Sequence, residues 1–306
     1  MAVDLNKLIT ESRNPDTMDI DLLPTEEILR KINNEDKAVA FAVEKAISQI
    51  TVLVDKTTEI IYLGGRLIYI GAGTSGRIGI LDAVECPPTF GISAETIQSV
   101  MAGGERAFIK AAEGAEDSAE AAITDLKNIN LSFSDIVIGI TASGRTPYAI
   151  GGVKYAKKIG CVTGSIATTA NSEISQFVDY PIEVITGPEV ITGSTRMKSG
   201  TAQKLICNMI STATMIKLGK VYQNLMVDVQ PTNEKLISRA RNILIQAAGI
   251  DREAAKKSID KFKTVKKALF SLLSGIESIE EVESYLNQTK GNIRKALELV
   301  NSDKNS

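Results

Sequence analysis

Histidine is absent from the 306-residue chain. This absence excludes Ser–His and Cys–His nucleophile pairs as well as histidine-ligated metal sites. The three cysteines, Cys86, Cys161 and Cys207, are isolated and form no CxxC pair. We therefore predict no metal site and expect all three cysteines to be small buried hydrophobic residues. Any acid–base work falls to Asp, Glu, Lys, Tyr or Cys.

Blocks of like charge and long apolar runs are also missing. The 35 basic and 37 acidic residues leave a net charge of −2, which gives no reason to expect binding to nucleic acid or to an acidic membrane surface. No apolar run approaches the roughly 20 residues of a membrane-spanning helix. The first residues, MAVDLNKLITESRN, lack the basic-then-apolar pattern of a signal peptide. We expect a cytoplasmic protein with no nucleic-acid or membrane partner.

Alternating apolar runs and helical patterns predict an α/β fold. Short apolar runs indicate buried strands at 66–71, 96–102, 135–142 and, more weakly, 161–169. Helical periodicity predicts helices at 35–63, 76–85, 105–127, 146–159 and 195–218. This alternation is typical of βαβ units, so we predict a parallel-sheet αβα sandwich.

The C-terminal part of the sequence changes character. From about Asn233 it is all-helical and more heavily charged, and residues 278–300 read as two short amphipathic helices broken at Lys290-Gly291. We predict two domains, 1–250 with the sheet and 251–306 as a small helical domain. No proline-rich linker separates them, so the boundary is soft.

A glycine-rich turn follows the first predicted strand. Gly71-x-Gly73-x-x-Gly76 matches the dinucleotide-binding fingerprint. A dinucleotide also needs an acidic residue at the end of the second strand to hold the ribose hydroxyls. That strand ends in VMAGG (100–104), which contains no acid. A nicotinamide enzyme is therefore the weakest interpretation.

Serine and threonine recur at three junctions that lead into helices. They stand beside backbone N–H groups that a helix start leaves free, and such groups suit a phosphate monoester. In the alternative interpretation, each hydroxyl only caps its own helix. Three such junctions in one parallel-sheet chain favour a phosphorylated ligand instead. Arg77 and Arg145 stay ambiguous, since either would equally suit a surface carboxylate. The predicted contacts are Thr74, Ser75, Gly76, Ser143, Thr146, Ser194, Thr195 and Lys198.

Several longer strings resemble the N-acetylmuramic acid 6-phosphate etherases of bacterial cell-wall recycling. They are GAGTSGRIGILDAVECPPTFG (71–91), AGGERAFIKAAEGAEDS (102–118), ASGRTPYAIGG (142–152) and TGSTRMKSGTAQK (192–204). The similarity also includes the N-terminal TESRNPDTMDID and the later NLMVDVQPTNEKL (224–236). It therefore covers nearly the whole chain, and LDAVECPPT is an unusual string.

This resemblance implies a sugar isomerase (SIS) domain that binds a phosphosugar and forms a homodimer. It implies cleavage of the lactyl ether of N-acetylmuramic acid 6-phosphate, giving N-acetylglucosamine 6-phosphate and D-lactate, without metal or organic cofactor. The two glutamates that the family uses correspond to Glu85, in LDAVECPPT, and Glu116, in EGAED.

Two carboxyl groups are sufficient for this chemistry. An aldehyde at C1 of the opened sugar acidifies the C2 proton, so a base removes it while an acid protonates the departing lactyl oxygen at C3. Weakly polar neighbours of Glu85 lead us to expect burial, a raised pKa and the acid role, although it would alternatively be a solvated residue at a helix end before a Pro-Pro turn. Only the resemblance selects Glu116 over three nearby acids, and its role, C2 base or positioning group, stays open. Those acids are Glu113, Asp117 and Glu120.

Two further functions remain as alternatives. An aldose–ketose phosphosugar isomerase of the same fold would move the C2 proton without releasing lactate. A non-catalytic phosphosugar-sensing regulator would bind only; the glucokinase regulatory protein has related motifs but two SIS domains in a longer chain. The helical C-terminal domain resembles ubiquitin-associated three-helix folds, and we expect it to serve packing or dimer support.

Overall fold

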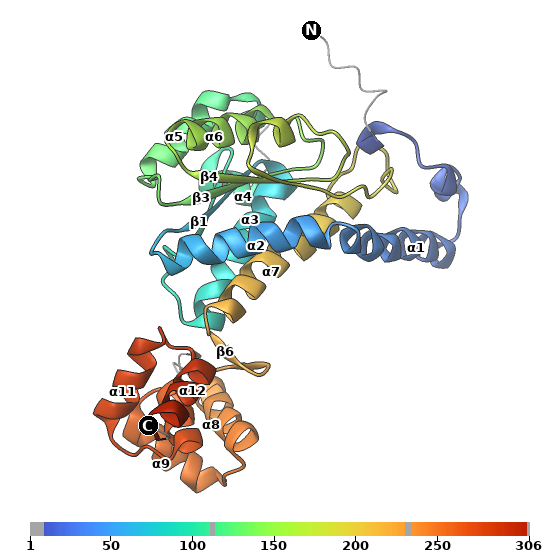
Figure 1. Ribbon diagram of the computed structural model, residues 1–306. Helices are drawn as coiled ribbons and strands as arrows, with labels where there is room; N and C mark the ends of the chain where they lie inside the picture. The colour runs from blue at the N-terminus through green and yellow to red at the C-terminus, as the bar shows by residue number, and fades with distance from the viewer. Residues whose placement is uncertain (1–8, 111–113, 230–233, 305–306) are drawn as a thin grey trace. The chain divides into compact units, whose positions relative to one another are not determined.

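The computed structural model describes residues 9–110, 114–229 and 234–304 (Figure 1). The chain divides into two compact units. The first comprises Met1–Val84 and Ala94–Ser211, and the second Glu85–Ser93 and Thr212–Ser306. The predicted boundary after residue 250 falls between two helices of the second unit and stays a prediction.

A five-stranded parallel sheet forms the centre of the first unit. Its strands are β1 (Leu67–Gly71), β2 (Ile97–Met101), β3 (Ile136–Thr141), β4 (Val162–Ala167) and β5 (Tyr180–Glu183), in the order β2-β1-β3-β4-β5. Every residue of β1 and β3 is buried, as expected for parallel strands that are covered on both faces. The predicted parallel-sheet sandwich is confirmed, as are the four predicted strands.

Helices cover both faces of this sheet (Figure 1). On one face lie α5 (Ala119–Asn128) and α6 (Pro147–Lys158), and on the other lie α2 (Ile47–Tyr62) and the start of α3 (Gly73–Phe90). Fully buried Tyr148 of α6 belongs to one hydrophobic cluster with Ile68 of β1 and Val137 of β3. Glycine at position 79 lets α3 approach closely, because a Cβ there would lie 3.0 Å from Cβ of Tyr69. The remaining helices of the unit are α1 (Thr25–Glu44), α4 (Gly104–Ile109) and α7 (Lys198–Lys217), whose last residues belong to the second unit.

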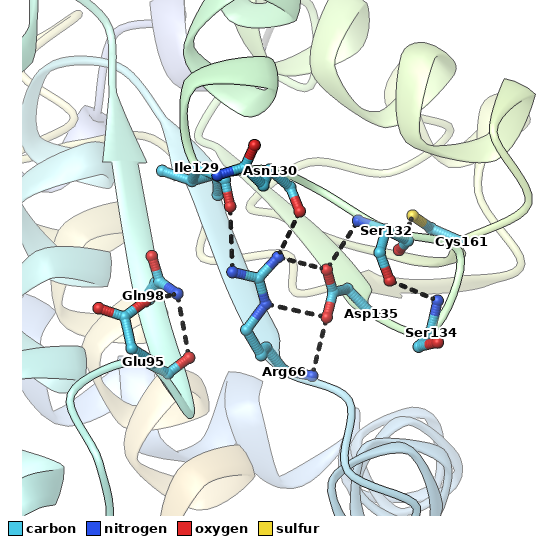
Figure 2. Close-up of polar contacts among 9 residues, drawn as sticks. All are labelled: Arg66, Glu95, Gln98, Ile129, Asn130, Ser132, Ser134, Asp135 and Cys161. Atoms are coloured by element: carbon cyan, nitrogen blue, oxygen red, sulfur yellow. Dashed lines mark hydrogen bonds and ion pairs between the residues drawn. The ribbon is translucent and has the colours of Figure 1, made fainter.

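A partly buried ion pair fixes the amino ends of β1 and β3 (Figure 2). Arg66 donates through Nη2 and Nε to the Asp135 carboxylate, at 2.7 and 3.1 Å, and through Nη1 and Nη2 to the carbonyl oxygens of Ile129 and Asn130. The backbone N–H of Ser132 also donates to Asp135. This network raises the pKa of Arg66, chiefly through the Asp135 hydrogen bond. It lies at the opposite end of these strands from the carboxyl ends that parallel sheets use for ligands.

Several predicted elements differ in extent from the observed ones. The single helix expected at 35–63 is two helices, α1 and α2, separated at Lys45-Ala46. The helix expected at 105–127 is α4, a 3-10 turn at Ala115–Asp117 and α5. Helix α3 begins at Gly73, three residues early, and β5 was not predicted.

Helices dominate the second unit. They are α8 (Glu234–Ala248), α9 (Arg252–Phe262), α10 (Val265–Ser274), α11 (Ile279–Gln288) and α12 (Ile293–Lys304). A short antiparallel hairpin of β6 (Val221–Tyr222) and β7 (Leu225–Met226) precedes them in the chain. Their core includes Phe262, Leu269 and Phe270. The predicted break between two helices at Lys290-Gly291 is confirmed, and both residues have positive φ.

Candidate active site

A cavity of about 410 Å³ lies at the carboxyl ends of β1 and β3. The strand order reverses between these two neighbours, and this switch point is where open parallel sheets bind ligands. The chain turns from β1 into α3 and from β3 into α6. The cavity is lined by Thr10, Glu11, Ala72, Gly73, Thr74, Ser75, Glu116, Asp117, Ala142, Ser143, Arg145, Thr146, Pro147, Gly193 and Thr195.

The first turn of α3 forms one wall of the cavity. Its residues Gly73, Thr74 and Ser75 line the cavity, so the N–H groups of a helix start face it. Gly76 serves close packing instead, because a Cβ at this position would lie 2.8 Å from the Gly71 carbonyl oxygen. The Ser75 hydroxyl is buried and donates to Oε1 of Gln203 at 2.9 Å.

The start of α6 forms a second wall. Thr146 is the N-cap and Pro147 occupies the first helical position. The Thr146 hydroxyl makes no capping bond and lies 2.8 Å from the Thr141 hydroxyl of β3. The first-turn N–H groups of α6 therefore receive no cap from this side chain. Ser143 lines the cavity in the preceding loop.

The start of α7 differs from the other two helix starts. The Glu189 carboxylate is fully buried and accepts the backbone N–H groups of Lys198 and Ser199 at 2.8 and 2.9 Å. These amides are therefore occupied within the protein, contrary to our expectation that this junction offers free N–H groups. The Lys198 ammonium donates to Glu35 at 2.5 Å and to the Pro188 carbonyl at 3.0 Å. The charge predicted to meet a ligand is therefore paired with Glu35 instead.

The loop before α7 reaches the cavity in part. Thr195 lines the cavity. Ser194 is half-buried and donates its backbone N–H to the Ile191 carbonyl at 2.9 Å. Of the eight predicted contacts, the structure thus brings together in the cavity Thr74, Ser75, Ser143, Thr146 and Thr195.

Carboxylates approach the cavity from the 3-10 turn before α5. Glu116 and Asp117 both line it and both are exposed. Glu120 stands in the first turn of α5, and Glu113 lies outside the described residues. Both Glu116 and Asp117 are therefore candidate carboxylates in this wall of the cavity.

Glu85 lies further along α3. Eleven residues separate it from Thr74 on one continuous helix, which is about 16 Å along the axis. Its side chain is exposed, so the burial expected from its weakly polar neighbours is wrong for the single chain. Pro87 and Pro88 do not form a turn after the helix but belong to its last turn.

The two ambiguous arginines have different surroundings. Arg77 donates to the carbonyl oxygens of Phe108 and Ala107, at 2.9 and 2.7 Å, and so caps the end of α4. Arg145 lines the cavity, and its guanidinium has no hydrogen-bond or ion-pair partner in the part of the chain that the structure describes. Arg145 is thus the cationic side chain available to an anionic ligand there.

The N-terminal segment also contributes to the cavity, and the residue patterns did not predict this. Thr10 and Glu11 line it, although they are about 60 residues from the glycine-rich turn in sequence. The string TESRN, which carries part of the family resemblance, was the available signal.

Within 9–110, 114–229 and 234–304, no three Cys, Asp or Glu residues are grouped so as to hold a metal ion. Across the same ranges, no helix has both the length and the apolar character needed to cross a membrane.

Comparisons with known proteins point to one family. A profile for the glucokinase regulatory protein N-terminal SIS domain matches residues 42–157. An N-acetylmuramic acid 6-phosphate etherase from Clostridium beijerinckii is 52% identical, over 98% of this chain and 99% of its own length. One from Exiguobacterium is 53% identical, over 96% of this chain and 100% of its own length. A solved phosphoheptose isomerase from Francisella tularensis matches with a TM-score of 0.47 at 14% identity, over 62% of this chain and 97% of that chain.

Proposed function

The chain belongs to the N-acetylmuramic acid 6-phosphate etherase family, and from this premise we propose that it cleaves the D-lactyl ether of N-acetylmuramic acid 6-phosphate. The products are N-acetylglucosamine 6-phosphate and D-lactate. We further propose that it acts in the cytoplasm, in the recycling of cell-wall amino sugars. The observation that carries the proposal is the cavity at the switch point, which combines two helix starts and their hydroxyls with the Glu116 carboxylate.

The polar groups of the cavity suit the two anionic parts of this substrate. The amino ends of α3 and α6, with the hydroxyls of Thr74 and Ser143, favour the 6-phosphate. The lactyl group carries a carboxylate, and a guanidinium matches a carboxylate with two parallel hydrogen bonds. Arg145 is therefore the residue that we assign to the second anion.

The reaction needs one base and one acid. With the sugar ring open, a carboxylate takes the C2 proton, and the C3–O bond breaks as an acid protonates the lactyl oxygen. D-lactate leaves, and a C2–C3 double bond remains in the sugar. Water then adds its oxygen to C3 and a proton returns to C2, which completes hydrolysis. Glu116 and Glu85 are the proposed pair, because a group that gives a proton in the first half takes one back in the second.

A homodimer would bring Glu85 to the reaction. Its distance along α3 from Thr74 and its exposure in the single chain both argue that another copy covers it. Leu81 and Val84, beside it on α3, are 48% and 58% exposed although apolar, as expected for residues that a partner copy buries. We propose that Glu85 of one copy works with Glu116 of the other.

The first test is D-lactate release from N-acetylmuramic acid 6-phosphate. We expect release by the unaltered protein and a loss of roughly 10²–10⁴ in rate for Glu85→Gln. Glu298→Gln, which alters an exposed glutamate of α12, is the matched control and should be fully active. Binding without lactate release would indicate a phosphosugar-sensing regulator, and sugar isomerisation would indicate an aldose–ketose isomerase.

A second test asks whether two copies share the site. Glu85→Gln and Glu116→Gln subunits are each nearly inactive, and equal amounts of both are unfolded and refolded together. If the site is shared, half of the dimers are mixed and each has one intact site, so about a quarter of the activity returns. If both glutamates act from one chain, mixing restores none.

A further inference from the structure

The N-terminal segment that reaches the cavity is held there by the loop before α7. The Gly193 N–H donates to the Thr10 carbonyl at 3.2 Å, and the Thr17 hydroxyl donates to the Val190 carbonyl at 2.9 Å. Asn14 adds a longer contact, from Nδ2 to the Pro188 carbonyl at 3.5 Å. These bonds join segments about 175 residues apart in sequence and fix the position of residues 10 and 11.

Thr10 is buried without a partner for its side chain. It is 1% exposed, and its hydroxyl makes no hydrogen bond within the described residues. A buried hydroxyl without a hydrogen bond costs free energy, because it has lost its contacts with water. Since Thr10 lines the cavity, a polar ligand there would supply the missing hydrogen bond.

Glu11 stands next to Thr10 with its carboxylate beside Gly193. Glycine has φ +77° at this position, and a Cβ there would lie 3.1 Å from Oε2 of Glu11. The absence of that Cβ leaves room for the carboxylate. Glu11 is half-buried and lines the cavity, and its carboxylate has no hydrogen bond or ion pair in the part of the chain that the structure describes.

We propose that Thr10 and Glu11 bind the neutral part of the sugar. This inference rests on the proposed function and adds the residues that select the substrate. An ionised carboxylate only accepts hydrogen bonds and repels anions, so Glu11 does not face the phosphate or the lactyl carboxylate. It accepts from a sugar hydroxyl or from the acetamido N–H, while Thr10 bonds an adjacent oxygen. The phosphate stays at the amino ends of α3 and α6.

The test compares two ligands that differ by this neutral part. Affinities for inorganic phosphate and for N-acetylglucosamine 6-phosphate are measured by calorimetry on the full chain. For Glu11→Gln we expect the dissociation constant of the sugar phosphate to rise about tenfold or more. The constant for inorganic phosphate should stay unchanged or fall slightly, because a nearby negative charge is gone. Glu27→Gln, in the exposed first turn of α1, is the matched control.

Thr10→Val separates binding from folding. Valine has nearly the shape of threonine but lacks the hydroxyl, so removing an unpaired buried group should leave the thermal midpoint unchanged or raise it. Affinity for the sugar phosphate should still fall severalfold. A purely structural Thr10 would instead give a lower midpoint with unchanged ligand discrimination.

Three results would overturn the proposal. They are equal weakening of both ligands in the variants, unchanged sugar phosphate affinity in both variants, and no binding of the sugar phosphate by the unaltered protein. The proposed reaction is tested separately, by D-lactate release. A protein that binds the sugar phosphate without releasing D-lactate contradicts the proposed reaction, while its affinities still decide the roles of Thr10 and Glu11.

Discussion

Ser75 illustrates how one buried amide controls a hydroxyl in the cavity. Its hydroxyl hydrogen is donated to Oε1 of Gln203, and Nε2 of the same amide is buried without a partner in the described residues. A phosphate only accepts hydrogen bonds, so Ser75 in this arrangement offers it no hydroxyl hydrogen. Turning the Gln203 amide over lets Nε2 donate to Ser75 and releases that hydrogen for the ligand.

We therefore expect Gln203→Glu to weaken binding of inorganic phosphate by about tenfold. An ionised carboxylate accepts from Ser75 in either orientation and also repels the phosphate, and both effects act in one direction. Gln203→Met removes the amide and leaves the Ser75 hydroxyl free, so it should bind phosphate like the unaltered protein. Titration calorimetry measures both variants, and equal affinity of Gln203→Glu and Gln203→Met would contradict this account.

Individual site residues were predictable where they follow strands directly. Thr74, Ser75 and Ser143 stand at the carboxyl ends of two apolar runs, and parallel strands bring those ends to one edge. Thr10 and Glu11 were not predictable in this way, because only tertiary hydrogen bonds to the loop at Gly193 carry them to the cavity. The roles of Glu85 and Glu116 as catalytic groups stay predictions.

At the scale of elements, buried strands were the clearest signal. β1 and β3 are continuous apolar runs because both of their faces are covered, whereas β5 is a four-residue edge strand, YPIE, with a proline and only one fully buried residue. The break between α1 and α2 lies in KAI, where no glycine or proline marks it. Helical periodicity continues across these residues, so the break was not predictable from the sequence pattern.

Helix α7 shows how one carboxylate determines what a helix start can bind. Glu189 is fully buried and accepts two first-turn N–H groups of α7, where the helix dipole stabilises its negative charge. The sequence pattern Gly-Ser-Thr before α7 is similar to the other junctions, so the hydroxyls there predicted a third anion site. The acid that occupies these amides stands about ten residues earlier in the chain.

Glu189→Gln should lower the free energy of unfolding by about 1–3 kcal/mol. The amide keeps one acceptor oxygen but turns its NH₂ group toward a backbone N–H, which leaves that donor unpaired in the interior. The loop carrying Thr195 to the cavity should also shift, so kcat/KM for lactate release should fall. Denaturant titration measures the first effect, with Glu298→Gln as control, and an unchanged midpoint would show that this cap contributes little.

At the scale of the whole molecule, stability rests on apolar packing rather than on covalent links. All three cysteines are buried, as predicted, and none of them forms a disulfide. The Cys161 thiol donates to the Ser132 carbonyl at 3.0 Å, near the Arg66–Asp135 pair. Burial, with the nearby Asp135 charge, raises the pKa of Cys161 from 9.0 to about 12, and burial also raises the pKa of Cys207 well above that ordinary value.

The reactivity of these thiols reports on the folded state without an activity assay. A raised pKa keeps each thiol protonated, and the thiolate is the reactive form. At pH 9, where an ordinary thiol is mostly ionised, Cys161 and Cys207 should therefore resist a disulfide reagent such as Ellman's reagent. Burial protects Cys86 by limiting access. We expect almost no fast colour from the native protein and three equivalents after unfolding in guanidinium, from the chain's three cysteines. Reaction of Cys161 within seconds under native conditions would mean that the amino ends of β3 and β4 open far more readily than their buried strands allow.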